Sequence, residues 1–368
     1  MRTRRSLRYW SCWIPFAISF LACATTDPRL AERDRALALD ERANRYVAEG
    51  DYAQAEPLYQ QSLAIREKGL GPGHPEVART LYDMAWLYEL KGDSAQAEQL
   101  YERSLAIYQK ALGPDHSDVA ILLNALAGLY KSMGNYARAE PLYERSLAIK
   151  EKALGPEHPD VAESLNQLAV LYDLKGDDAR AKPLYEQSLA IREKALGPEH
   201  LDVAESLFNL ARLYHLKGDY ARAEPLYEQS LAIREKALGP EHLDVANPLT
   251  GLGGLYKSKG DYARAELLLE RSLAIREKTL GPDHPEVAAA LNNVAVIYDL
   301  KGDHSRAESL YERSLAISEE ALGPDHPQVA DTLHNLAELY ESKGDDVRAK
   351  PLFERSRAIR EKALRSNR

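Results

Sequence analysis

The chain repeats itself every 42 residues, and this period constrains its fold more than any other feature. The tripeptide Leu-Gly-Pro recurs at that spacing from Leu70 to Leu322. The 22 residues at 183–204 occur again, unchanged, at 225–246. A fixed period in this range is typical of arrays that stack one supersecondary unit, because a single unit cannot bury its own apolar face. We therefore expect one continuous array rather than several unrelated domains.

Each unit is predicted to fold as two helices, as residues 154–195 illustrate. Pro159 suits the first position of a helix, because its missing N–H would have no partner there. Apolar residues then recur at helical spacing from Val161 onwards, and Gly176 suits the left-handed cap that ends this first helix, helix A. Asp177 is a good N-cap for the second helix, helix B, which runs to the next Leu-Gly-Pro.

The repeats account for nearly all of the chain, and the predicted architecture is an all-α, right-handed superhelical solenoid of stacked helix-turn-helix units. The expected segments are a linker at 23–30 and a repeat domain at 31–368, made of a partial unit from 28–69, seven full units at 70–363 and a tail at 364–368. Eighteen of the 21 tyrosines occupy repeat positions, which predicts that they pack in the core. The recurrent charged runs REK and YER are interpreted as solvated helix faces.

The repeat pattern LGPxHPxVAxxLNNLAxLYxxKGDYxxAxxLYxxxLxIxEKxLG resembles the kinesin light chain class of tetratricopeptide repeats (TPR). The resemblance covers about 340 residues. It implies a protein-interaction module without catalytic activity or cofactor. In TPR proteins helix A lines a concave groove, and the ligand lies against the non-core positions of that helix.

By register, the predicted groove positions are residues 79, 82, 86 and 89 and their equivalents every 42 residues. Core positions repeat from unit to unit, whereas these positions vary. Such variation favours a role in recognition. The alternative is variation without function on a solvated helix face.

Several groove positions carry residues that suit binding. Asn124, Asn166 and Asn292 resemble groove asparagines of the kinesin light chain class, whose amides can bind a peptide backbone. Trp86 lies on a non-core face, and exposed aromatic residues near arginine are typical of binding hot spots. The candidate partner-binding residues are Arg79, Tyr82, Trp86, Asn124, Lys131, Asn166, Phe208, Arg212, His215, Lys257, Asn292 and His334.

Residues 1–22 are predicted to be a signal peptide. A basic start, MRTRRSLR, precedes about 14 mostly apolar residues, too few to span a bilayer comfortably. The segment FLACATT resembles a bacterial lipoprotein cleavage site, with Cys23 as the lipidated N-terminus. Because Ala24 follows this cysteine, we expect the periplasmic face of the outer membrane. The alternative is ordinary cleavage around Cys23, which releases a soluble periplasmic or secreted protein.

The charge of the chain argues against two classes of partner. The net charge is −9, and the four arginines of the first 22 residues leave about −13 for the remainder. An acidic body disfavours nucleic acid and anionic membrane surfaces. The expected partner is a protein or peptide, with membrane contact only through the lipid anchor. The oligomeric state stays open.

These features predict a non-enzymatic interaction scaffold of the bacterial cell envelope that needs no cofactor. One alternative is a lipoprotein adaptor that docks envelope enzymes or assembly factors, and another is a passive spacer. A remote alternative is a metal-dependent hydrolase, since Glu199, His200 and Asp202 lie close in sequence. Seven of the ten histidines hold this one repeat position, two helices apart, whereas metal–nitrogen bonds are about 2 Å long. We therefore interpret these histidines as helix-start residues.

Two local features depart from simple helix rules. Five units carry proline about six residues into helix B, which predicts either a bend or a late helix start. The unit at 238–279 carries Pro248, Gly251, Gly253 and Gly254 in helix A. Each extra glycine weakens a helix by about 1 kcal/mol. We expect this unit to be the least stable of the array.

Overall fold

The computed structural model describes residues 28–366, and this part of the chain is almost entirely helical, without β-strands. The all-α prediction is confirmed. The predicted signal peptide, Cys23 and most of the linker lie outside the described residues. No helix between residues 28 and 366 combines the length and the apolar character needed to cross a membrane. The helices are α1 (Pro28–Glu49), α2 (Tyr52–Leu70), α3 (Pro75–Lys91), α4 (Ser94–Leu112), α5 (Ser117–Ser132), α6 (Tyr136–Leu154), α7 (Pro159–Leu174), α8 (Asp178–Leu196), α9 (Leu201–Leu216), α10 (Tyr220–Leu238), η2 (Leu243–Val245, a 3₁₀ turn), α11 (Ala246–Ser258), α12 (Tyr262–Leu280), α13 (Pro285–Leu300), α14 (His304–Leu322), α15 (Pro327–Ser342) and α16 (Asp346–Ser366).

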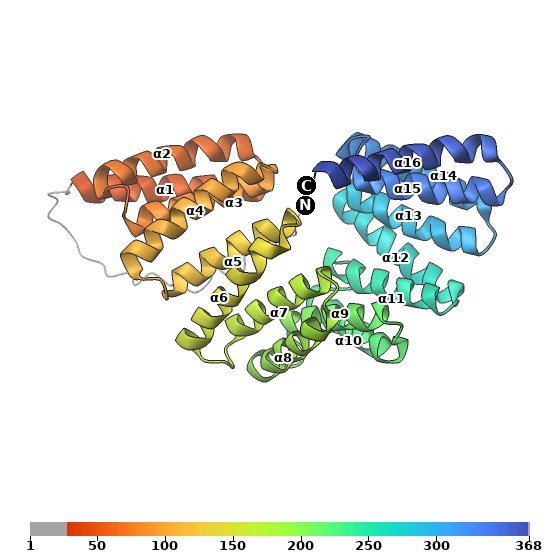
Figure 1. The fold of residues 1–368 in the computed structure, drawn as a ribbon, viewed down its shortest axis with the longest axis horizontal. Helices are drawn as coiled ribbons and strands as arrows, with labels where there is room; N and C mark the ends of the chain where they lie inside the picture. Colours follow the sequence, from red (N-terminus) through yellow and green to blue (C-terminus); the bar gives the residue numbers. More distant parts are fainter. Residues whose placement is uncertain (1–27, 367–368) are drawn as a thin grey trace. The chain divides into compact units, whose positions relative to one another are not determined.

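The α-helices form antiparallel pairs, one pair per repeat (Figure 1). In each pair the odd-numbered helix is helix A and the even-numbered helix is helix B. Within each unit a helix packs mainly against its pair partner and then against the neighbouring pair, as α3 packs against α4 and then against α2. The pairs group into two compact units, unit 1 ending at Ala153 and unit 2 beginning at Leu154. The expected solenoid of stacked helix pairs is confirmed.

Helix A begins at the recurrent histidine. In each full repeat the histidine is the N-cap, and its Nδ1 accepts a hydrogen bond from the backbone N–H two residues later, at 3.1–3.2 Å. His200, for example, accepts from the N–H of Asp202. The bond satisfies one of the N–H groups that have no partner within the helix. The interpretation of these residues as helix-start residues is confirmed.

Glycines end both kinds of helix. Gly176 follows α7 with φ of +73°, in the left-handed region. Gly197 ends α8 with φ of 85° and ψ of 156°, a conformation that essentially only glycine adopts. Between the two helices, Asp177 caps α8 by accepting the N–H of Arg180 at 3.2 Å. The predicted helix boundaries of this repeat are therefore confirmed to within a residue.

The prolines of helix B lie inside the helices and do not delay their start. Helix α8 begins at Asp178, continues through Pro183 and ends at Leu196. Each proline is exposed, and so is the residue four positions earlier, whose carbonyl loses its intrahelical partner. Water can therefore satisfy that carbonyl. The same arrangement holds for Pro57, Pro141, Pro183, Pro225 and Pro351.

Inside each pair a serine hydroxyl joins the two helices. Ser188 of α8 donates to the carbonyl of Ala162 in α7 at 2.7 Å, and the other seven pairs repeat this bond at 2.6–3.1 Å. A fully buried tyrosine packs beside it in most repeats, such as Tyr185 in α8. The prediction that the repeat tyrosines belong to the core is confirmed for twelve of the eighteen, and the other six, those at the Tyr52 position together with Tyr46 and Tyr88, are half-buried.

A tyrosine–glutamate–lysine contact joins consecutive pairs at three joints, α2–α3, α10–α11 and α14–α15. The hydroxyl of Tyr256 in α11 donates to one carboxylate oxygen of Glu224 in α10 at 2.6 Å, and Lys259 lies 2.7 Å from the other oxygen. At the joint between α8 and α9, Lys182 replaces this glutamate. Tyr214 there reaches Glu186 instead, at 3.3 Å. The joint between α8 and α9 therefore lacks the shared carboxylate.

Lys182→Glu should strengthen this joint. The new carboxylate can accept from Tyr214 and pair with Lys217, which now lies 3.3 Å from Asp178. We expect the free energy of unfolding to rise by up to about 1 kcal/mol. Lys182→Gln removes the cation but adds no anion, so it should raise the free energy of unfolding by less than Lys182→Glu does. Chemical denaturation at low and high salt checks this, and an equal gain in both variants would contradict it.

The repeat at 238–279 has a distorted helix A. It starts as the 3₁₀ turn Leu243–Val245 and continues as α11, which has 13 residues where α9 and α13 have 16. Because Pro248 has no N–H, the carbonyl of Asp244 loses its helical partner, and Arg234 donates to it at 3.0 Å. The shortened helix supports the expectation that this repeat is the least stable.

Amide hydrogen exchange should therefore be faster at 243–259 than at 285–301, the equivalent segment of the following repeat. The glycines and the 3₁₀ turn reduce the free energy needed to open this helix locally. Exchange followed by mass spectrometry compares the two segments in one sample. Equal or slower exchange at 243–259 would show that tertiary contacts compensate for the weak helix.

Candidate partner-binding surface

The predicted groove positions lie on one face of each helix A, called here the helix-A face. It comprises residues 79, 82, 86 and 89 and their equivalents at intervals of 42. In unit 2 the helices A lie next to one another, because α9 contacts both α7 and α11 directly. Side chains from successive repeats therefore meet on this face.

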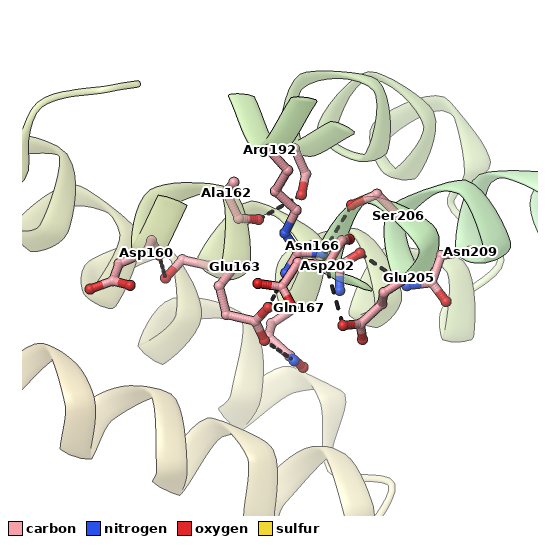
Figure 2. Close-up of polar contacts among 12 residues, drawn as sticks. Asp160, Ala162, Glu163, Asn166, Gln167, Arg192, Asp202, Glu205, Ser206 and Asn209 are labelled. Carbon is pink, nitrogen blue, oxygen red and sulfur yellow. Dashed lines mark hydrogen bonds and ion pairs between the residues drawn. The ribbon is translucent and has the colours of Figure 1, made fainter. Parts of the chain in front are cut away.

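A buried arginine ties three helices together beneath the helix-A face (Figure 2). Arg192 of α8 is 2% exposed. Its guanidinium donates to the carboxylate of Glu163 in α7, to Ser206 Oγ in α9 at 2.9 Å and to the carbonyl of Asp202 at 3.0 Å. Arg192 belongs to an REK run. The interpretation of these runs as solvated faces is wrong for this position, because the arginine fills a polar gap between repeats.

Two of the three groove asparagines are engaged between helices A. Asn166 Oδ1 accepts from Asn209 Nδ2 at 3.0 Å, as Figure 2 shows, and Asn292 Oδ1 accepts from Asn335 Nδ2 at 3.1 Å. Asn166 is only 1% exposed. Its amide is therefore not open to a ligand backbone, in contrast to the expectation. Asn124 in α5 is half-buried, and its Oδ1 is buried without a hydrogen-bond partner.

Three candidates gather on α9, at helical spacing, and form the α9 cluster: Phe208, Arg212 and His215. The Phe208 ring lies 5.6 Å from the buried Tyr227 of α10, and the His215 ring lies 6.2 Å from the same tyrosine. Arg212 pairs with Asp173 of α7. All three side chains of the cluster are half-exposed. The α9 cluster thus places an aromatic ring, a guanidinium and an imidazole group side by side on a partly solvent-accessible surface.

Charges around the α9 cluster come from α7 and α11. Burial lowers the pKa of His215, and the nearby charge of Lys257 lowers it further. Burial raises the pKa of Asp173 although Arg212 beside it acts in the opposite direction. Lys257 is exposed and forms no ion pair with the described residues. The surface here can offer a cation and aromatic edges to a partner.

In unit 1 the candidate aromatic residues are partly core. Trp86 is half-buried and packs against an apolar cluster from α1, α2 and α3 that includes Val47 and Met84. The prediction of a non-core position for Trp86 is therefore only partly correct. The Tyr82 ring lies 5.6 Å from the Tyr101 ring, and burial raises the pKa of Tyr82 to about 12.

The remaining candidates lie on other helices than α9. Arg79 is exposed on α3. Lys131 Nζ lies 5.6 Å above the ring of Tyr143. His334 Nε2 in α15 lies 3.3 Å from Glu338. Within residues 28–366, no three His, Cys, Asp or Glu side chains group in a way that suits a metal ion.

Comparison with known protein families shows to which family the chain belongs. The tetratricopeptide repeat description matches overlapping segments at residues 34–110, 90–152, 118–194, 179–236, 216–278, 244–320 and 300–362. The chain belongs to the tetratricopeptide repeat family. No curated protein matches the sequence.

The chain is also similar to solved structures. BtubC (BKLC) from P. vanneervenii is 26% identical, with a TM-score of 0.51, over 63% of this chain and 91% of that chain. Kinesin light chain-type, nearly identical TPR-like repeats from Podosopora anserina are 34% identical over 56% of this chain and 98% of theirs, with a TM-score of 0.49. The quorum sensor NprR from B. thuringiensis is 14% identical, with a TM-score of 0.69 over 91% and 89% of the chains, and shares the fold.

TPR register located the helix-A face but did not identify the buried arginines. A signal exists in the sequence for two of the four buried arginines of the described residues, Arg66 and Arg192, because a hydroxyl residue stands 14 positions after each. Arg234 and Arg276 have Pro248 and Ala290 at that position and carry no such signal. Arg66 donates to Thr80 as Arg192 donates to Ser206, at the same repeat positions. An arginine at this repeat position that is followed by a hydroxyl residue at this spacing is therefore predicted to be buried between two repeats.

Proposed function

We propose that this TPR array is a non-catalytic scaffold that binds a protein or peptide partner on the helix-A face of unit 2. The observation that carries the proposal is the α9 cluster. The equivalent positions are Asn166, Val170 and Asp173 in α7, and Thr250, Gly254 and Lys257 in α11. Packing between repeats therefore does not require an aromatic, a guanidinium and an imidazole group here. Phenylalanine and arginine are enriched at protein interfaces, and arginine also among binding hot spots.

The α9 cluster is favoured over Trp86 as the centre of the surface. Trp86 contributes to the apolar cluster of unit 1, so its substitution would weaken the fold as well as any contact. Phe208 and Arg212 rest on Tyr227 and Asp173 at their inner sides, which limits their mobility before a partner binds. A surface ordered in advance loses less conformational entropy on binding.

Site-specific photo-crosslinking tests this proposal. A photoreactive amino acid at Lys257 should capture a defined partner in cells, whereas the same group at the exposed Ala232 of helix B should not. The captured partner should then bind Phe208→Ala and Arg212→Ala variants at least tenfold more weakly, as expected for hot-spot residues. Binding that is unchanged in both variants would place the interaction elsewhere. A captured envelope enzyme or assembly factor would identify the scaffold as an adaptor.

We also propose that the protein is exported and lipid-anchored through Cys23, on the periplasmic face of the outer membrane. The support is the basic, apolar and small-residue order of residues 1–22 and the cysteine that follows. Wild-type protein should incorporate radiolabelled palmitate and sediment with outer membranes. Cys23→Ala should lose the label and become soluble after export. A labelled Cys23→Ala variant, or an unlabelled wild type, would favour the soluble alternative.

A further inference from the structure

Two buried aspartates occupy, in unit 1, the positions of an asparagine pair. The asparagine bonds described above join residues 43 positions apart on consecutive helices A, as in Asn166 and Asn209. The same register in α1 and α3 places Asp40 and Asp83 opposite each other. Asp40 is 5% exposed and Asp83 is 7% exposed. Two carboxyl groups therefore replace two amides at a buried joint.

One carboxylate oxygen of Asp40 lacks the hydrogen bond that the asparagine pairs form at this position. Asp40 Oδ2 accepts from Arg66 of α2, whereas Asp40 Oδ1 is buried without a hydrogen-bond partner. In the asparagine pairs the corresponding Oδ1 accepts from the side chain 43 residues later. Asp83 can donate to Asp40 in the same way only if its carboxyl group carries a proton.

We propose that Asp40 and Asp83 share one proton in a carboxyl–carboxylate hydrogen bond that holds the pair α1–α2 on α3 in a pH-dependent manner. The O–H of Asp83 donates to Oδ1 of the ionised Asp40. At higher pH the proton passes to water, and two buried carboxylates then repel each other. The inference rests on the fold of unit 1 and does not depend on the partner proposed for unit 2.

The charges around the pair favour one ionised and one protonated carboxyl group. Burial raises the pKa of Asp40, but the ion pair with Arg66 opposes this rise, so Asp40 ionises more readily than Asp83. Arg79 is exposed, and its attraction for Asp83 is weaker than the effects of burial and of the Asp40 charge. Burial and the Asp40 charge raise the pKa of Asp83 to about 7. The titratable and charged groups that face the pair are Tyr59 and Arg66 of α2, Glu76, Arg79 and Tyr82 of α3, and Tyr101 and Tyr108 of α4.

The direction of the pH effect follows from the two states of Asp83. In the unfolded chain its pKa is near 3.8, and in the folded chain it is about 7. The stabilisation is therefore complete below about pH 4, decreases as the pH rises through this window, and is lost above about pH 7. Within the window, the equilibrium constant for opening α1–α2 should rise by up to about tenfold per pH unit.

Hydrogen exchange of the full chain tests the proposal. Opening constants for α1 and α2, corrected for intrinsic exchange, are measured from pH 5 to pH 8 in wild type and in Asp83→Asn. The ratio of wild type to variant should grow up to about 100-fold between pH 5 and pH 7 and then level off, because an amide donor at position 83 needs no proton. A ratio independent of pH would overturn the proposal. So would a carbon-13 titration of the Asp83 carboxyl group with a midpoint below pH 5.

A transplanted pair provides a matched test in unit 2. Relative to Asn166 and Asn209, Arg192 stands where Arg66 stands relative to the aspartates. The double variant Asn166→Asp with Asn209→Asp should therefore make exchange of α7 and α9 depend on pH in the same window. Asn166→Asp alone should not, since Asn209 still donates. If the double variant fails to fold, the Asp83→Asn comparison in unit 1 still decides the question.

Discussion

Arg192→Leu should lower the free energy of unfolding by about 3 kcal/mol. The guanidinium is buried between α7, α8 and α9 and satisfies Glu163, the Ser206 hydroxyl and the Asp202 carbonyl. Leucine would leave the Glu163 carboxylate, whose side chain is 23% exposed, without its cation. Removing one member of a buried ion pair typically costs 3–5 kcal/mol, of which apolar burial of leucine recovers part. Chemical denaturation followed by circular dichroism measures the loss.

Arg360→Leu is the matched control, because Arg360 holds the same repeat position in α16. Its side chain is 47% exposed and pairs with Asp331, which is 67% exposed. Solvent already screens this pair, so the loss should stay below about 1 kcal/mol. Similar losses in the two variants would mean that burial between repeats is not what makes Arg192 important.

Gly253→Ala should destabilise unit 2 by roughly 1 kcal/mol, although alanine normally favours a helix by about that amount. A Cβ atom at residue 253 would lie 2.6 Å from Cγ of Leu269. The overlap involves the branch point of a buried side chain, and relieving it costs about 2 kcal/mol. In the preceding repeat, the equivalent positions hold Ala211 and Tyr227, both buried. Glycine at 253 therefore accommodates leucine at 269.

The double variant Gly253→Ala with Leu269→Tyr should recover at least wild-type stability, because it restores the alanine–tyrosine pair of the other repeats. Leu269→Tyr alone should be nearly neutral or mildly destabilising, since glycine leaves the ring without a methyl neighbour. A double-mutant cycle should then show a favourable coupling of about 2 kcal/mol. Additive effects of the two substitutions, or a stabilising Gly253→Ala, would contradict the predicted overlap.

Local sequence rules predicted the repeat boundaries well because neighbouring residues decide them. His158 caps α7 through a backbone N–H two residues away, and Asp177 caps α8 through one three residues away. Gly197 is needed because other residues do not tolerate its backbone angles. The prolines show the limit of such rules. An interior Pro183 predicts a disturbed helix, but solvent exposure lets α8 continue through it.

The polar surface could not be predicted in the same way, because its partners come from other helices. Asn166 looks open on a helical projection, yet Asn209 of the next helix A binds its amide. Arg192 looks solvated beside glutamate and lysine, yet Ser206, 14 residues later, lies against it. Trp86 lies outside the helical stripe of core positions, yet residues of α1 and α2 partly cover it.

The 42-residue period, the caps and the buried tyrosines were sufficient to define the helices and their stacking, since each depends on backbone geometry or on apolar spacing within one repeat. Which polar side chains remain available for a partner was decided by the packing of consecutive repeats. The physical reason is desolvation. A buried amide or guanidinium must find a partner across the joint, whereas the half-exposed side chains of the α9 cluster keep part of their surface accessible.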